Sequence, residues 1–210
     1  MRKKIVAGNW KLHGSRVFAR ELLDAVIAQP ATSGVEVAIL PPMPYLSELT
    51  EHYGNSGLFF GSQDHSVNEQ GAFTGEVSAR MILDVGCHYA LVGHSERRHI
   101  HQESNDLVAH KFAVAKKVGL TPIFCVGESL HQREAGQTEW AIQKQIEALF
   151  HVCGPQAFAN AVLAYEPVWA IGKVTGLKIT EMERRFFHVP GKRLSLMFKM
   201  TNPMGTVSSY

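Results

Sequence analysis

The segment Ala164–Gly172, Ala-Tyr-Glu-Pro-Val-Trp-Ala-Ile-Gly, places a single carboxylate between an apolar run and an apolar loop. The run Ala161–Tyr165 is short enough to be a buried strand. Pro167 has no N–H and keeps Glu166 extended, so the strand must end there. A carboxylate at a strand end under an apolar flap suits a general base in a site that closes over its substrate. The alternative is a strand end followed by a buried hydrophobic turn.

Length and composition indicate one globular domain. The chain has 210 residues, of which 45% are hydrophobic and 19% charged, with a formal net charge of +2. This charge predicts neither nucleic acid nor a membrane surface as a partner, and no apolar run approaches the roughly 20 residues of a membrane span. Cys87, Cys125 and Cys153 are odd in number and widely spaced, which predicts reduced thiols in a cytoplasmic protein.

Strand and helix patterns alternate about six times along the chain. The strands are continuous apolar runs, which predicts a parallel sheet covered on both faces. Polar residues follow the strand ends, where (β/α)-barrels and open α/β sheets both place their sites, so pattern alone does not choose between them. No Gly-x-Gly-x-x-Gly follows the first strand, which counts against a dinucleotide-binding fold. The predicted strands are Ile5–Ala7, Val35–Leu40, Leu58–Phe60, Tyr89–Val92, Leu120–Val126 and Ala161–Tyr165; the predicted helices are Ser15–Ala28, Tyr45–Tyr53, Ser78–Leu83, Asn105–Lys117 and Thr138–Phe150.

His94 lies at the end of the fourth predicted strand. Ser95 is a good N-cap, which would put His94 at the positive end of a helix and disfavour imidazolium. A neutral imidazole can donate a hydrogen bond to a substrate oxygen; the alternative is a histidine satisfied by the backbone. His99 and His101 lie nearby, but no carboxylate or cysteine spacing supports a metal site, so we expect none.

Lys11 follows the first strand, where a fixed positive charge would suit a phosphate or a developing enolate oxygen. A solvated surface lysine is the alternative. Asn9 could orient Lys11 or His94. Glu96 could support these groups, or could simply be an acidic residue favoured in the first turn of a helix.

Five motifs together resemble the triosephosphate isomerase family in their order and approximate spacing. Any one could occur by chance, whereas five in register are very specific. The motifs are Ala7-Gly8-Asn9-Trp10-Lys11, Gly71-Ala72-Phe73-Thr74-Gly75-Glu76, Val92-Gly93-His94-Ser95-Glu96-Arg97-Arg98, Cys125-Val126-Gly127-Glu128 and Ala164–Gly172.

The resemblance implies a (β/α)8 TIM barrel that interconverts dihydroxyacetone phosphate and glyceraldehyde 3-phosphate without a metal or organic cofactor. It implies that Glu166 is the base, that His94 is a neutral electrophile and that Lys11 stabilises charge, with Glu96 in support. It also implies a homodimer acting on a small phosphosugar. Three further sets of residues come from the resemblance: Asn9, Lys11 and Gly172 as substrate contacts; Pro167, Val168, Trp169, Ala170 and Ile171 as a lid; and Phe73, Thr74 and Gly75 as dimer contacts.

Residues 173–210 lack the family's glycine-rich motifs for strands seven and eight. They carry seven Lys and Arg against two Asp and Glu, a net of +5, whereas residues 1–172 carry 14 against 17, a net of −3. We therefore expect a barrel domain over 1–172 and an unmatched basic tail over 173–210, read in a different frame or otherwise unrelated. Leu194–Phe198 could be one short strand.

An incomplete barrel of about six βα units would leave the edges of strands one and six unpaired. The sequence therefore also predicts low stability and weak or absent activity. The alternative function is a catalytically inactive truncated product or a dimerising fragment of the enzyme.

Overall fold

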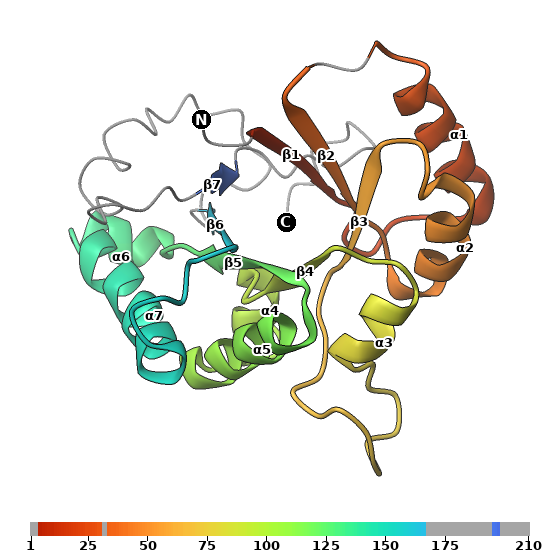
Figure 1. The fold of residues 1–210 in the computed structure, drawn as a ribbon. Helices are drawn as coiled ribbons and strands as arrows, with labels where there is room; N and C mark the ends of the chain where they lie inside the picture. The colour runs from red at the N-terminus through yellow and green to blue at the C-terminus, as the bar shows by residue number, and fades with distance from the viewer. Residues whose placement is uncertain (1–3, 31–32, 167–194, 198–210) are drawn as a thin grey trace.

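The computed structural model describes residues 4–30, 33–166 and 195–197. In these residues seven parallel strands form one sheet in chain order, β1 to β7. Figure 1 shows the sheet curving, with the helices along its outer side. The strands are β1 (Lys4–Asn9), β2 (Val35–Leu40), β3 (Leu58–Ser62), β4 (Tyr89–Val92), β5 (Thr121–Val126), β6 (Val162–Tyr165) and β7 (Ser195–Met197); the helices are α1 (Arg16–Ile27), α2 (Met43–Tyr53), α3 (Ala79–Asp84), α4 (Ser95–His99), α5 (Asn105–Val118), α6 (Leu130–Glu134) and α7 (Thr138–Cys153).

The six predicted strands are confirmed to within a few residues at their ends, and they form the parallel, incomplete barrel that the sequence predicts. The short strand anticipated near Leu194–Phe198 is β7. The expectation that the sixth strand has an unpaired edge is wrong, because β6 pairs with β7 from Val162↔Ser195 to Ala164↔Met197. β7 also lies in contact with β1, although no strand pairing joins these two within the described residues.

Local sequence signals fix the helix ends. Ser15 caps α1 by accepting a hydrogen bond from the N–H of Phe18, and Ser104 caps α5 in the same way. α5 ends at Gly119, whose φ of 99° lies in the left-handed region that favours glycine. The helix that was expected to begin beside His94 is α4, although no end was predicted for it. The helix α6 was not predicted, because five residues are too few to show a helical repeat of apolar positions.

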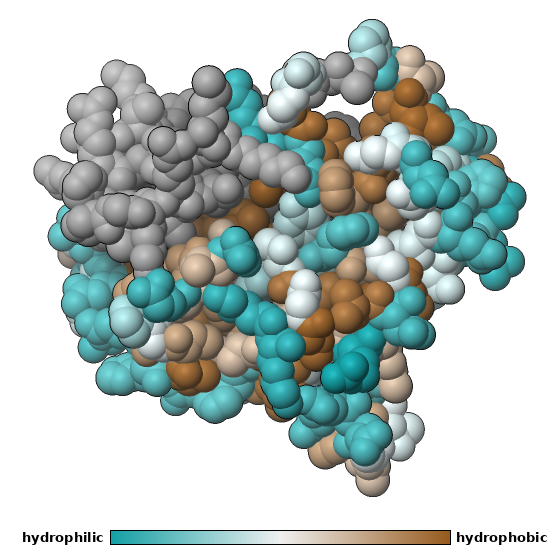
Figure 2. Space-filling model, viewed as in Figure 1, coloured by the Kyte–Doolittle hydropathy of each residue, from teal (hydrophilic) through white to brown (hydrophobic). Residues whose placement is uncertain are grey.

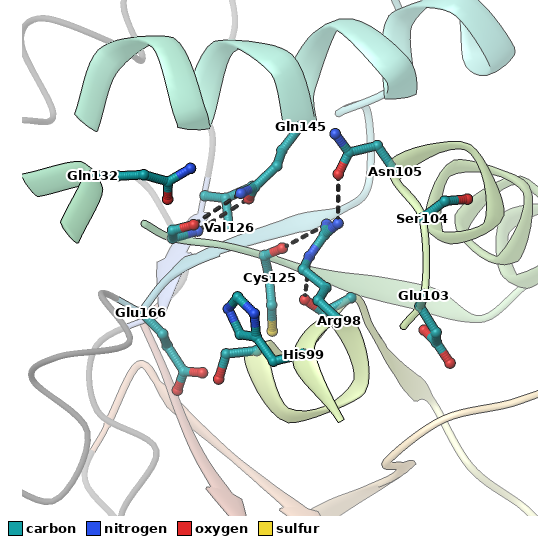
Figure 3. A pocket seen from close by; sticks show the side chains of 13 residues that line it. Arg98, His99, Glu103, Ser104, Asn105, Cys125, Val126, Gln132, Gln145 and Glu166 are labelled. Atoms are coloured by element: carbon teal, nitrogen blue, oxygen red, sulfur yellow. Dashed lines mark hydrogen bonds between the residues drawn. The ribbon is translucent and has the colours of Figure 1, made fainter. Parts of the chain in front are cut away.

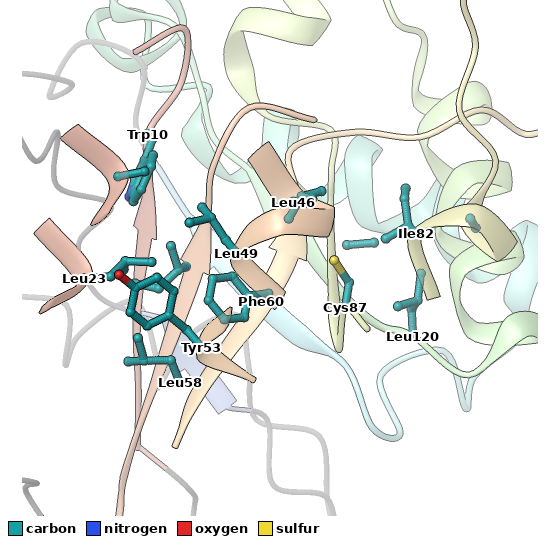
Figure 4. Packing of buried hydrophobic residues seen from close by; sticks show 14 of the residues in the cluster. Trp10, Leu23, Leu46, Leu49, Tyr53, Leu58, Phe60, Ile82, Cys87 and Leu120 are labelled. Atoms are coloured by element: carbon teal, nitrogen blue, oxygen red, sulfur yellow. The ribbon is translucent and has the colours of Figure 1, made fainter. Parts of the chain in front are cut away.

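The buried side chains form one layer inside the curved sheet and two outside it. The inner layer consists mostly of small and aliphatic residues such as Ala7, Leu91 and Ile123, with Tyr89 as its buried aromatic residue. One outer layer packs β1–β3 against α1–α3 and includes Trp10, Leu23 and Phe60 (Figure 4). The other packs β4–β6 against α5 and α7. The sheet is therefore covered on both faces, as its continuous apolar strands predicted.

The surface mixes polar and apolar side chains. Figure 2 shows hydrophilic residues over the α1 side and the α5–α7 side, with apolar residues between them. Large apolar side chains reach solvent at Leu12, Val17 and Ile100. In the part of the chain that is described, no helix has the length and apolar character that a membrane crossing requires.

Phe112 tests how far the second outer layer supports the fold. It is fully buried and makes edge-to-face contacts with Phe124 and Phe158, at centroid distances of 5.8 and 6.3 Å. Phe112→Ala is expected to lower the free energy of unfolding by about 3–5 kcal/mol, because it leaves a cavity. Val17→Ala, at an exposed position, should change it by less than about 0.5 kcal/mol. Urea denaturation measures both, and equal losses would contradict this packing.

Candidate active site

Parallel strands bring the predicted site residues to one edge of the sheet. Asn9 ends β1 and Lys11 follows it, His94 follows β4, and Glu166 follows β6. All of these positions are at C-terminal strand ends, which lie together in a parallel barrel. The structure brings Lys11, His94, Glu96 and Glu166 within a few ångströms of one another.

His94 is held as a neutral imidazole. Its Nδ1 accepts a hydrogen bond from the backbone N–H of Glu96 at 3.2 Å, so Nδ1 carries no proton and the neutral ring carries its proton on Nε2. Burial lowers the pKa of His94 to about 4; the charge of Glu96 opposes this shift and that of Lys11 adds to it. The predicted capping residue was wrong, because the N-cap of α4 is His94 itself, with Ser95 as its first helical residue.

Glu166 faces His94 from β6. Its Oε2 lies 3.3 Å from His94 Nε2, and this oxygen is buried and makes no hydrogen bond within the described residues. Its backbone N–H donates to Val126 O at 2.8 Å, which fixes the main chain at the strand end. Burial raises the pKa of Glu166 to about 7, with Lys11 lowering it and Glu96 raising it. A carboxyl group with this pKa can both take and return a proton near neutral pH.

Lys11 completes the cluster through two predicted neighbours. Its Nζ donates to Glu96 Oε1 at 2.5 Å, and its backbone N–H donates to Asn9 Oδ1 at 2.9 Å. Glu96 is therefore both an acidic residue in the first turn of α4 and the ion-pair partner of Lys11. The φ of Lys11 is 52°, a left-handed conformation that costs a non-glycine residue about 1–2 kcal/mol.

Gln63 was not singled out from the sequence, yet it supports this strained position. Its Nε2 donates to Lys11 O at 3.0 Å and to Leu40 O at 2.9 Å. One side-chain amide thus ties the ends of β1 and β2 to the end of β3. Its place shortly after the predicted strand Leu58–Phe60 was the signal that could have found it.

The loop after β5 is held from both sides. Glu128 is fully buried and accepts hydrogen bonds from Tyr165 OH at 3.0 and 2.9 Å. Gln145 of α7 donates to Gly127 O at 2.8 Å and accepts from Gly127 N at 3.1 Å. The residue before Glu166 is thereby fixed to the β5 end as well.

A cavity of about 330 Å³ opens beside Glu166, between the ends of β4 and β5 and the helices α4, α5 and α7. Figure 3 shows Arg98, Asn105, Gln132 and Gln145 around it. Most of these lining groups are polar, and Ser95 Oγ is buried without a hydrogen-bond partner in the described residues. The cavity therefore suits water or a small polar molecule rather than an apolar ligand.

The structure does not bring the remaining predicted site residues into this cluster, because they either fall outside the described residues or belong to another loop. The expected lid, Pro167, Val168, Trp169, Ala170 and Ile171, and the expected phosphate contact Gly172 lie outside the described residues. Phe73, Thr74 and Gly75 lie in the long loop between β3 and α3, and Phe73 is 46% exposed. No group of three His, Cys, Asp or Glu residues within the described ranges could hold a metal ion.

The fold and the site together define a (β/α)-barrel enzyme that transfers protons. A family model described as triosephosphate isomerase matches residues 4–188, which is past the boundary at 172 that the motifs predicted. The triosephosphate isomerase of Stenotrophomonas maltophilia (strain K279a) is 58% identical over 188 residues, which are 90% of this chain and 74% of that protein. That of Xanthomonas campestris pv. campestris (strain 8004) is 57% identical with the same coverage. The chain belongs to the triosephosphate isomerase family.

The opposite pKa shifts of Glu166 and His94 make stability depend on pH in opposite directions. The raised pKa of Glu166 means that its contribution to stability is lost as pH rises from about 4.5 to about 7. The lowered pKa of His94 means that its contribution is lost as pH falls from about 6.5 to about 4. Where the two ranges overlap, between about pH 4.5 and about pH 6.5, the two contributions to the pH dependence of stability offset each other.

Glu166→Gln removes the pH dependence of stability that comes from Glu166 and keeps the one that comes from His94. We expect the stability of the variant, relative to the unmodified protein, to rise between pH 5 and pH 7, because the variant no longer ionises a buried group. Urea unfolding at the two pH values measures the difference. Glu51→Gln, on an exposed part of α2, is the control. The same pH trend in both variants would exclude a buried, shifted Glu166.

Proposed function

We propose that this chain interconverts dihydroxyacetone phosphate and D-glyceraldehyde 3-phosphate, as an aldose–ketose isomerase. The observation that carries the proposal is the contact between the buried Oε2 of Glu166 and Nε2 of a neutral His94, 3.3 Å apart at the C-terminal end of the sheet. The comparisons support it, since 90% of the chain matches proteins named triosephosphate isomerase.

Glu166 acts as the base in this proposal. Its carboxylate takes a proton from the hydroxyl-bearing carbon beside the substrate carbonyl; the C–H electron pair forms the C=C bond of an enediolate, and the carbonyl π pair moves onto oxygen. The hydroxyl proton then passes from the first oxygen to the second, the carbonyl forms again at the first carbon, and the protonated carboxyl group returns its proton to the neighbouring carbon. Atoms and electrons balance within one substrate molecule, so the step calls for no oxidant, reductant or cofactor. A Glu166 pKa of about 7 makes the carboxylate a stronger base than an ordinary glutamate while a large share of it stays ionised near neutral pH.

His94 and Lys11 stabilise the charge that develops on the substrate oxygens. The Nε2–H of neutral His94 donates to an oxygen, and the Lys11 cation lowers the energy of the enediolate. Glu96 and Asn9 orient Lys11 through its Nζ and its backbone N–H. This division between a glutamate base and a neutral histidine is the one known for the family.

Closure and assembly complete the proposal. Pro167 to Ile171 form a lid that excludes water, and the N–H of Gly172 contacts the phosphate. The chain works as a cytoplasmic homodimer, in which Phe73, Thr74 and Gly75 of one copy reach the pocket of the other near Asn9 and Lys11. The exposure of Phe73 is consistent with a contact of this kind.

The first test is isomerase activity of the purified 210-residue chain. We expect Glu166→Gln to lower kcat by at least about 10³-fold, because the amide cannot take the proton while it preserves the shape of the side chain. A soluble, folded chain with activity no greater than that variant would favour the alternative, a catalytically inactive truncated product.

The pH profile tests the assignment of the base. Activity requires ionised Glu166, so kcat/KM should rise with pH through a midpoint of about 7 and fall tenfold per unit below it. The second ionisation of a phosphate monoester, near pH 6, is separated by titrating the substrate alone. A midpoint near 4.5 would contradict a buried base.

The dimer is tested by Phe73→Asp. A charge at this exposed aromatic position should shift the protein toward monomer and lower activity at low concentration, because an interface cannot bury an unpaired carboxylate without cost. Analytical ultracentrifugation measures the state, with Trp140→Asp, at a similarly exposed position on α7, as the control. If the unmodified protein sediments as a monomer, the proposed homodimer is wrong.

A further inference from the structure

We propose that Arg98 is a positioning residue, which fastens the turn that carries His94 to the strand end that orients Glu166. This inference rests on the proposed function, because it assigns a role toward the same base and electrophile. Arg98 itself touches neither reacting group, and it acts through two backbone segments.

The guanidinium of Arg98 joins three separate elements (Figure 3). Its Nε donates to Gly93 O at 2.8 Å, in the turn between β4 and α4. Its Nη2 donates to Cys125 O at 3.2 Å, in β5. Its Nη1 donates to Asn105 Oδ1 at 2.7 Å, in the first turn of α5. Every nitrogen of the group therefore serves a different part of the site's framework.

The acceptors of Arg98 are neutral. Within the described residues no carboxylate lies within ion-pair distance of Arg98, and burial lowers the pKa of its guanidinium. A charge buried against carbonyl and amide oxygens costs desolvation, which the charge of Glu103 offsets only in part. The position therefore depends on the planar geometry of arginine, which a lysine ammonium with a single nitrogen cannot reproduce.

Gly93 connects this contact to His94. Its φ of 71° favours glycine, and an added Cβ would lie 2.7 Å from Arg98 Nη2 and 2.6 Å from Val108 Cγ1. The guanidinium thus packs directly on the residue before His94. The His94 ring is in turn tied to its own turn by the Nδ1 bond to the N–H of Glu96, so a shift of this turn moves the imidazole.

The β5 strand connects the same contact to Glu166. Cys125 O accepts from Arg98, and the next carbonyl, Val126 O, accepts from the N–H of Glu166 at 2.8 Å. Arg98 therefore spans the two main-chain segments whose separation sets the 3.3 Å approach of His94 Nε2 to Glu166 Oε2. Loss of its hydrogen bonds lets these segments move apart and admits water to the His94 ring.

The experiment is Arg98→Lys in the full chain, read in two independent ways. The kinetic expectation is a fall in kcat of about 10–100-fold with KM within about threefold, because misplacement affects the chemical step more than binding. The second readout needs no activity. It is the titration of His94 by ¹⁵N NMR of histidine-labelled protein, assigned by the signals lost in His94→Gln. Arg98→Lys should raise the His94 pKa from about 4 toward 6.5. Arg20→Lys, on the exposed side of α1, should change neither quantity.

An unchanged His94 titration in Arg98→Lys would overturn the proposal, even if kcat falls. A shifted titration with unchanged kcat in an active enzyme would overturn it as well. If the unmodified chain is inactive, the proposed function has failed, and the NMR titration still decides whether Arg98 sets the position of His94. If Arg98→Lys does not fold, Asn105→Ala removes one acceptor only. It should shift both readouts in the same direction by a smaller factor, and no shift would overturn the proposal.

Discussion

The backbone of β5 holds the site together, because it lies between the strand that leads to His94 and the strand that leads to Glu166. β5 pairs with β4 up to Val92↔Phe124 and with β6 up to Val126↔Tyr165. Parallel ladders fix the stagger of neighbouring strands, so the two side chains that follow β4 and β6 meet across the end of β5. The carbonyls of Cys125 and Val126 lie beyond the β4 pairing, and they accept from Arg98 and from the N–H of Glu166.

The charge states of the site residues follow from how deeply each side chain is buried. The side chains of Lys11 and Glu96 keep 26% and 43% of their exposure, so solvent reduces the cost of holding both charges. The side chain of His94 keeps only 4%, and this is why its neutral form is favoured despite a nearby carboxylate. Glu166 is pushed the other way, toward its neutral form, by the same desolvation. The acid–base pair therefore has pKa values of about 4 and about 7, with the carboxyl group titrating above the imidazole.

Much of this arrangement could be predicted from sequence, because strand ends are marked by local signals. Apolar runs that stop at Gly93 and at Pro167 are enough to assign His94 and Glu166 to the same edge of the sheet. The capping residue of α4 was missed, since a histidine at an N-cap is unusual beside a serine that could serve. Gln63 and Arg98 were missed for a different reason. Most of their partners are backbone oxygens on other elements, and Gln63 lies 52 residues from Lys11. A side chain that binds distant main chain leaves no periodicity or spacing to read.

The pairing of β6 with β7 changes how the C-terminal part of the chain bears on the site. Had β6 been an edge strand, its free N–H and C=O groups would have made the base's own strand the least protected of the sheet. Pairing with β5 and β7 makes β6 an internal strand. β7 also contacts β1, the strand that leads to Asn9 and Lys11, so the first and last described strands lie close together. Three residues of β7 therefore have an effect out of proportion to their number. They protect the strand that presents Glu166, and they contact β1, the strand that leads to Lys11.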